Sequence, residues 1–375
     1  MDKQVDKRAI AALAILLAAC SSPTGPQPTP LTPIARPQTV KVLWSGDVGN
    51  GERYVFSPAF ADDAVYGAAR NGTVSRFDAG NGRRTWSVTA GERLSGGVGT
   101  DGRIVAVANE DGEVFALDAA TGQKRWTARV SSEVIAAPAV GANMVLVRSI
   151  DNRVAAFDAQ DGKRRWVYQR SPSSLIIRTP AGITIDGDLA FAGFAGGKLA
   201  ALALSNGGVR WEATVALPKG ATELERVSDV VGSPVVQERE VCAATYQGRV
   251  GCYEIANGRQ VWARDISSLT GVSVDARYAF VSDDKGVVQA FDRTNGRSVW
   301  KQDKLANRQL SLPQPFGELV AVGDFEGYVH LLARETGEFV GRYATGSGPV
   351  RAAPRPIPGG LLVETQSGAL YALIP

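Results

Sequence analysis

A short pattern that recurs about every forty residues constrains the fold of this chain more than any other feature. It is clearest in VFALDAATGQKRW, residues 114–126, where alternating apolar residues run into an Asp, a Thr-Gly turn and a Trp. Related segments occupy 74–86, 154–166, 199–211, 250–262 and 287–300, and a degraded copy occupies 329–341. A self-similar unit of this kind indicates a repeat architecture.

The tryptophans mark the period of the repeat. They stand at positions 44, 86, 126, 166, 211, 262 and 300, and Gly341 takes the next Trp position. The successive spacings are 42, 40, 40, 45, 51, 38 and 41 residues, and all seven Trp residues of the chain share this register. A period of about 40 to 45 residues is typical of a solenoid or a propeller.

Each period has the pattern of four strands. In residues 101–118, apolar positions alternate with small or polar ones around Asp111-Gly112, which is a hairpin signal. Each of eight such hairpins follows a short strand, and all but the last precede a strand that carries Trp or, in one case, Gly341. Four antiparallel strands per unit make a propeller blade.

The two chain ends fit together in this scheme. The last hairpin ends at Pro375 without a fourth strand, whereas residues 41–48 carry Trp44 with no hairpin before it. We therefore predict an all-β, eight-bladed β-propeller of four-stranded antiparallel blades over residues 38–375. The N-terminal strand should be the outer strand of the last blade, closing the ring and removing a free edge.

The Asp and Trp of the repeat are expected to serve the fold rather than a binding site. An Asp side chain can accept bonds from nearby backbone N–H groups in a turn, and Gly accepts positive φ. The Trp ring should pack between neighbouring blades while its N–H finds a partner. This interpretation covers the Trp series and Asp78, Asp118, Asp158 and Asp292.

The N-terminus has the pattern of an export signal. Basic residues precede an apolar run over 9–19 that is too short to span a bilayer, so residues 1–19 are interpreted as a signal peptide. The segment 17–20, Leu-Ala-Ala-Cys, resembles the bacterial lipobox, which implies lipidation of Cys20, palmitate included, and stable membrane anchoring. Ser21 favours the outer membrane by the same resemblance. An ordinary secretory signal ending in Cys is the alternative.

Residues 20–37 form the predicted tether. Proline stands at 23, 26, 28, 30, 33 and 37, so this segment should be an extended spacer of about 50 Å that holds the body away from the membrane.

Composition and motifs exclude several classes of function. Lys and Arg number 41 against 38 Asp and Glu, a net charge of +3, and the mixed charges give no footprint for nucleic acid. The single histidine, His330, has no metal-spaced companion and is interpreted as an ordinary strand residue. No P-loop or zinc pattern is present.

Cys242 and Cys252 flank the turn at Gln247-Gly248. A two-residue turn pairs Cys252 with Ala243 and keeps the thiols on opposite faces, whereas a three-residue turn places the two cysteines opposite one another, where a disulfide can form. The sequence leaves both registers open.

Two irregular connections predict a binding surface. Trp126 and Pro138 are 12 residues apart, but Trp211 and the equivalent Pro234 are 23 apart. The preceding connection, residues 167–180, carries Leu175 and Ile177 beside Arg178. Both connections follow a Trp strand, so they should emerge on one face, where apolar residues beside Arg suit a protein interface. The alternative is that Leu175 and Ile177 pack into the core.

The repeat ending Ala-x-Asp-x-x-Thr-Gly-x-x-x-Trp resembles that of pyrroloquinoline quinone (PQQ) propellers, which implies a periplasmic PQQ-dependent dehydrogenase as one functional hypothesis. Members of that class carry a pair of adjacent cysteines over the cofactor and acidic ligands for calcium. No adjacent Cys pair exists here. Fold analogy alone does not establish the activity.

A second resemblance covers essentially the whole chain. The lipobox, the Pro-rich tether, the eight-fold propeller, and the segments TELERVSDVVGSPVV (222–236) and GDFEGYVHLL (323–332) together resemble the BamB family, lipoprotein subunits of the outer-membrane β-barrel assembly machinery. The resemblance implies a non-enzymatic scaffold without a cofactor, on the periplasmic face of the outer membrane. Its expected partners are BamA POTRA domains, the rest of the Bam complex and unfolded β-barrel precursors.

The same resemblance indicates contact residues. In that family a Leu-x-Leu-Arg loop and a nearby acidic segment contact BamA, which implies roles here for Leu175, Ile177, Arg178 and Asp229. Val231 stands where a second acidic residue is common in the family. A scaffold of another envelope complex, or a protein that binds cell-wall glycan, is the competing interaction class.

Overall fold

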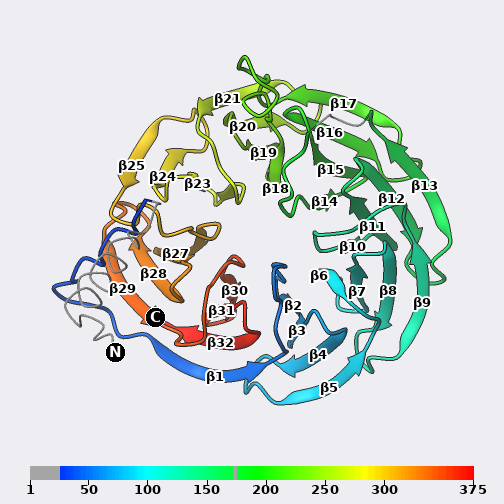
Figure 1. Ribbon diagram of the computed structural model, residues 1–375, viewed down its shortest axis with the longest axis horizontal. Helices are drawn as coiled ribbons and strands as arrows, with labels where there is room; N and C mark the ends of the chain where they lie inside the picture. The colour runs from blue at the N-terminus through cyan, green and yellow to red at the C-terminus, as the bar shows by residue number, and fades with distance from the viewer. Residues whose placement is uncertain (1–25, 172–174) are drawn as a thin grey trace, which may run out of the picture.

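The computed structural model describes residues 26–171 and 175–375, so the predicted signal peptide and Cys20 lie outside the described residues. Eight four-stranded sheets are arranged around a ring (Figure 1). Every strand pair within them is antiparallel, and the described segments contain strands as their only regular secondary structure. None of them forms a helix long and apolar enough to cross a membrane. The prediction of an all-β, eight-bladed propeller is confirmed.

The first four blades follow one another along the chain. Blade 1 contains β2 (Ala59–Ala61), β3 (Ala64–Ala68), β4 (Thr73–Asp78) and β5 (Arg84–Thr89); blade 2 contains β6 (Leu94–Thr100), β7 (Ile104–Asn109), β8 (Glu113–Asp118) and β9 (Lys124–Arg129); blade 3 contains β10 (Ala139–Gly141), β11 (Met144–Ser149), β12 (Arg153–Asp158) and β13 (Arg164–Gln169); blade 4 contains β14 (Ile183–Asp186), β15 (Leu189–Phe194), β16 (Lys198–Ala203) and β17 (Val209–Thr214).

The last four blades complete the ring. Blade 5 contains β18 (Val230–Gln237), β19 (Glu240–Thr245), β20 (Arg249–Glu254) and β21 (Gln260–Asp265); blade 6 contains β22 (Ser273–Val274), β23 (Tyr278–Ser282), β24 (Val288–Asp292) and β25 (Ser298–Gln302); blade 7 contains β26 (Gln314–Phe316), β27 (Leu319–Gly323), β28 (Tyr328–Ala333) and β29 (Phe339–Ala344); blade 8 contains β30 (Arg355–Ile357), β31 (Gly360–Glu364), β32 (Ala369–Ile374) and β1 (Lys41–Asp47).

The ring is closed by pairing the two ends of the chain. Strand β1 lies beside β32 (Figure 1), and the two pair antiparallel with Trp44 opposite Ala372. The outer strand of the last blade therefore comes from the N-terminal side, as the sequence predicts. This pairing covers the edge that β32 would otherwise expose.

Each Trp joins two neighbouring blades. Its indole N–H donates to a backbone carbonyl of the next blade, for example Trp126 to Ala159 at 2.9 Å. Its ring packs on the turn glycine of that blade, so closely that a Cβ on Gly258 would lie 2.6 Å from Cε3 of Trp211. The seven pairs are Trp44–Gly82, Trp86–Gly122, Trp126–Gly162, Trp166–Gly207, Trp211–Gly258, Trp262–Gly296 and Trp300–Gly337. The interpretation of the Trp series as structural is confirmed.

The exception at Gly341 follows from ring closure. In blade 8 the third and fourth strands are the end and the start of the chain, so no turn glycine joins them and a Trp from blade 7 would have none to pack on. Gln38 lies there instead. It pairs in parallel with Gly341, and its N–H donates to the carbonyl of Val340 at 2.7 Å.

The repeated Asp shapes the turn before Trp in four of the blades, at Asp78, Asp118, Asp158 and Asp292. One oxygen of Asp118 accepts from the backbone N–H groups of Ala120 and Thr121 at 3.1 and 2.9 Å, and Gly122 adopts a φ of 73°. The other oxygen bonds Arg125 at 2.6 Å. The Arg125 bond first, then those from Thr121, lower the pKa of Asp118 to about 2.

The register at the cysteines is the three-residue alternative. Cys242 lies opposite Cys252 in the β19–β20 ladder and the two form a disulfide. The left-handed residue of the turn is Gln247, with φ 48°, rather than Gly248. Gly248 is required for space, because a Cβ there would lie 2.3 Å from Oγ1 of Thr245.

The proline-rich segment lies on the propeller instead of extending from it. The backbone of residues 27–32 makes hydrogen bonds to the connection between blades 6 and 7 and to Arg342 of the outer strand β29. The prediction of a free spacer is wrong for this part, because Arg308 and Arg342 supply donors that a proline-rich backbone can satisfy.

Candidate protein-docking face

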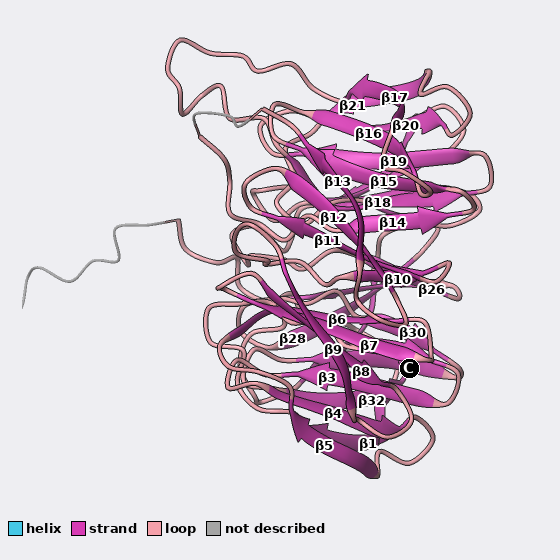
Figure 2. Ribbon diagram, turned by 90° about the vertical axis from the view of Figure 1, so that its right-hand side faces the viewer, coloured by secondary structure: helices cyan, strands magenta, loops and turns pink. Residues whose placement is uncertain are grey.

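Successive blades are joined on one face of the ring, which we call the connection face. The connection from β13 to β14 spans 170–182, and the connection from β17 to β18 spans 215–229. Each follows the outer strand of its blade, so both emerge on this face, as the sequence predicts. Figure 2 shows the longer one projecting from one side of the molecule.

The first connection presents an apolar and a basic side chain to solvent. Leu175 is 43% exposed and Arg178 is exposed, whereas Ile177 is half-buried. The alternative that Leu175 packs into the core is therefore wrong. A single exposed leucine would need no explanation, but one beside an exposed Arg on an irregular loop suits an interface.

Asp229 fixes the backbone of this loop from its buried side. Its side chain is only 5% exposed, and its oxygens accept from the N–H of Ile177 at 2.8 Å and of Gly196 at 3.1 Å. Burial raises the pKa of Asp229, and these two bonds and the charge of Arg148 offset the effect only in part. Burial in turn lowers the pKa of Arg148 to about 10. The carboxylate thus fixes the loop backbone and is not presented to solvent.

Arg178 is paired across a blade boundary. Its Nη2 lies 2.7 Å from Oε2 of Glu133, whose other oxygen lies 2.8 Å from the hydroxyl of Tyr54. Glu110 also reaches that hydroxyl, at 3.0 Å. These partners come from three other connections and turns of the same face, and no sequence signal predicts them because they are not adjacent to Arg178 in the chain.

An open cavity of about 510 Å³ lies at this charged cluster. It is lined by Arg53, Glu110, Asp111, Glu133 and Arg178. Both basic and acidic groups line it, and Nη2 of Arg70 lies 2.6 Å from Oε2 of Glu110. Such a surface is complementary to a partner that also carries both signs of charge.

The longer connection carries two more exposed leucines, Leu217 at 65% and Leu224 at 73%. Its tip is a short turn closed by a capping box. Oε2 of Glu225 accepts from the N–H groups of Ala221 and Thr222, while Oγ1 of Thr222 accepts from the N–H of Glu225 at 3.2 Å. The Thr-x-x-Glu spacing was a readable signal for this turn.

Comparisons with known proteins identify the family. A family model described as outer membrane protein assembly factor BamB matches residues 70–302. BamB of Bordetella pertussis is 43% identical over 345 residues, which cover 92% of this chain and 89% of that protein. This chain belongs to the BamB family.

Other relatives agree with this assignment. BamB of Pseudomonas aeruginosa is 43% identical over 369 residues, 97% of each chain. The crystal structure of BamB from Moraxella catarrhalis matches with a TM-score of 0.83 and 26% identity, covering 90% of this chain and 100% of that one. A quinohemoprotein alcohol dehydrogenase from Comamonas testosteroni matches with a TM-score of 0.72 at 14% identity, which shows a common fold alone.

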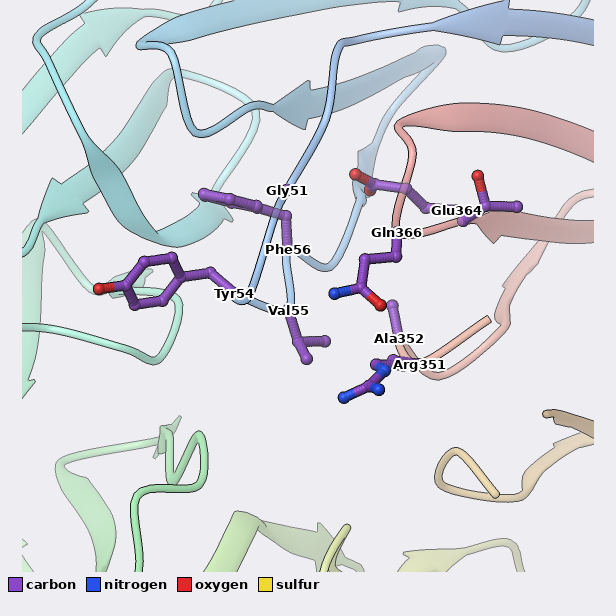
Figure 3. Close-up of a pocket in the computed structure, with 9 residues that line it drawn as sticks. Gly51, Tyr54, Val55, Phe56, Arg351, Ala352, Glu364 and Gln366 are labelled. Carbon is purple, nitrogen blue, oxygen red and sulfur yellow. The ribbon is translucent and has the colours of Figure 1, made fainter. Parts of the chain in front are cut away.

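One pocket of this BamB-family chain is too small for a quinone cofactor. Figure 3 shows a pocket between blades 8 and 1, where Gly51, Tyr54, Phe56, Arg351 and Glu364 are among the lining residues. Its volume of about 10 Å³ has room for about one water molecule, so a tricyclic quinone does not fit. Among the described residues, no group of three or more His, Cys, Asp or Glu is placed to hold a metal ion.

Proposed function

We propose that this protein is a non-enzymatic scaffold of the outer-membrane β-barrel assembly complex, which binds the POTRA domains of BamA and assists the assembly and insertion of β-barrel precursors. Family membership over nearly the whole chain carries this proposal. The chain's own support is the exposed loop with Leu175 and Arg178 on the connection face.

The docking mechanism follows from how the loop is held. Asp229 fixes the backbone at Ile177, so Leu175 and Arg178 meet a partner with little loss of loop entropy. Leu175 fills an apolar pocket of the POTRA domain. Arg178 forms a charge-assisted bond to an acidic group of the partner, either in place of its bond to Glu133 or in addition to it.

The same proposal includes the anchor and the order of segments. Residues 1–19 are removed as a signal peptide, and Cys20 is lipidated and inserts in the periplasmic leaflet of the outer membrane. Residues 20–37 connect it to the propeller over 38–375. Mass spectrometry of the mature N-terminal peptide tests this part, because an unmodified Cys20 would contradict it.

Precursor binding is assigned to the outer edges of the blades. Strands such as β9 and β13 end their sheets and leave backbone groups unpaired on one side. An unfolded barrel strand can add to such an edge by β-augmentation. The other blades share this feature except the seventh, where Gln38 pairs with the edge of β29, so we expect weak and sequence-tolerant binding.

The decisive experiment measures binding to purified BamA POTRA domains by isothermal titration calorimetry. Arg178→Glu and Leu175→Ala should each weaken binding by about 2 kcal/mol, roughly thirtyfold, if they are interface anchors. Arg239→Glu is the matched control, since Arg239 is exposed on the β18–β19 turn of the opposite face. Equal affinities for wild type and Arg178→Glu would sink the assigned docking loop.

A further inference from the structure

A second contact surface lies at the junction of blades 6 and 7, and a segment of the chain itself occupies it. We propose that this junction is a docking site for an extended, proline-rich segment. The chain's own residues 27–32 occupy it and so set the length of the tether between the membrane and the propeller. Figure 1 shows the start of the described chain, in blue, beside β28 and β29 before it reaches β1.

The site recognises the backbone of the segment. The N–H of Thr29 donates to the carbonyl of Ala306 at 3.0 Å, and the carbonyl of Thr29 accepts from Nη1 of Arg308 at 3.1 Å. The carbonyl of Gln27 accepts from Nδ2 of Asn307 at 3.0 Å. The carbonyl of Thr32 accepts from both terminal nitrogens of Arg342, at 3.4 and 3.3 Å.

Prolines prepare the segment for this role. Pro28 and Pro30 flank Thr29, and Pro33 follows Thr32. A polyproline II segment makes no internal hydrogen bonds, so its carbonyls are free to accept from outside, and little entropy is lost on docking. Leu31 adds an apolar contact, since it packs against the buried cluster between blades 6 and 7 that contains Trp300, Leu305 and Leu332.

The floor of the site is a buried charged network. Arg308 is 2% exposed and bonds Asp324 at 2.7 Å as well as Glu326. Asp324 lies 2.9 Å from Nε2 of His330, whose Nδ1 accepts from Arg342 at 3.0 Å. His330 is therefore an internal member of the network with no exposure, and burial lowers its pKa. The network fixes both guanidinium groups toward the segment.

Docking shortens the tether. This step rests on the proposed lipidation of Cys20. With residues 27–37 held on the body, only the seven residues 20–26 separate the lipid from the docked segment, a reach of at most about 25 Å, whereas all eighteen residues 20–37 would reach at most about 60 Å when fully extended. Thr29 lies at the connection between β25 and β26, so the tether leaves the propeller on the face that carries Arg178.

The test measures the position of the segment in the full-length protein, without lipid or BamA. Spin labels are placed at Pro26→Cys and Lys304→Cys, two exposed positions, in a chain with Cys20→Ser, because Cys242 and Cys252 are held in the disulfide and do not react. The Cys20→Ser chain without the two introduced cysteines is the blank. We expect a short, narrow distance distribution by pulsed electron paramagnetic resonance. A broad distribution like that of a flexible chain would overturn the proposal.

Variants separate docking from folding. Leu31→Asp should broaden the distribution and increase the exchange rate of the Thr29 amide roughly tenfold or more. Ala35→Asp adds the same charge at an exposed position of the same segment and should change neither. Thr29→Pro, which removes the N–H that donates to Ala306, should broaden the distance distribution as Leu31→Asp does, while the propeller melts normally. Unchanged distances in both docking variants would contradict the site, whatever the outcome with BamA.

Discussion

Glu364 is a carboxyl group enclosed at the junction of blades 8 and 1. It is 4% exposed, and its Oε2 has no hydrogen-bond partner among the described residues. Burial raises its pKa well above the ordinary value of 4.5, and the negative charge of Asp47 adds to the effect. The folded protein therefore favours the neutral acid.

We expect Glu364→Gln to stabilise the protein in a pH-dependent way. Because the pKa of Glu364 is raised in the folded state, its contribution to folding stability is fully present below about pH 4.5. That contribution is lost as the pH rises toward the folded-state pKa. The free energy of unfolding of the variant should match that of wild type near pH 4.5 and exceed it by at least about 1 kcal/mol at pH 8. A pKa shift of less than one unit corresponds to this difference. Urea unfolding at both pH values measures this difference, and a constant difference would contradict the assignment.

Asp229 illustrates a residue that acts through its neighbours. Asp229→Asn keeps the size of the side chain but leaves one of the N–H groups of Ile177 and Gly196 without an acceptor, which costs about 1–3 kcal/mol. We expect a lower melting temperature and faster amide exchange at Ile177. Asp188→Asn, at an exposed position in the next turn, makes the same chemical change and should be neutral. An equal response from both variants would argue against a role for Asp229 in holding the loop.

At the scale of the element, the contact between a Trp and the next turn glycine holds the blades together. Gly258→Ala should be destabilising by about 2–4 kcal/mol, because it combines a φ of 73° with a Cβ 2.6 Å from Trp211. Gly187→Ala is a matched control, with a φ of 55° and open space around the added Cβ. The difference in unfolding free energy between the two variants measures the cost of the clash with Trp211. Equal decreases in unfolding free energy would show that backbone strain alone destabilises both.

The disulfide stabilises blade 5 in particular. Cys242 and Cys252 close a loop with a sequence separation of 10 residues and are both fully buried. Replacing both with Ala should lower the free energy of unfolding by about 3 kcal/mol. Denaturant titration of wild type with and without a reductant provides the comparison. A double variant as stable as the oxidised protein would exclude this contribution.

At the scale of the whole molecule, stability depends on closure by β1. A chain that begins at residue 48 lacks this strand, exposes the edge of β32 and loses the Trp44–Gly82 contact. We expect it to self-associate or fail to fold, whereas a chain that begins at residue 38 should stay monomeric with a lower melting temperature. Light scattering after size-exclusion chromatography distinguishes these outcomes, and a monomeric 48–375 chain of normal stability would contradict them.

The blades and their order were readable from the sequence because their signals are local. The hairpin at Asp111-Gly112 and the turn from Asp118 to Gly122 lie within a few residues of each other, and the Trp spacing repeats them around the ring. Trp44 without a hairpin predicted closure by the N-terminal strand, because a ring leaves only one place for it. The loop with Leu175 and Arg178 was visible as a departure from the regular repeat.

Only the tertiary structure decided which distant groups meet. Glu133 pairs with Arg178 and Asp229 turns inward to Ile177, although neither contact has a sequence signal. The cysteine register depended on space at Gly248. The docked segment meets residues about 280 positions away, since Gln27 bonds Asn307. The repeat determined the ring by short-range geometry, whereas these contacts arise only when the closed ring brings separate connections onto one face.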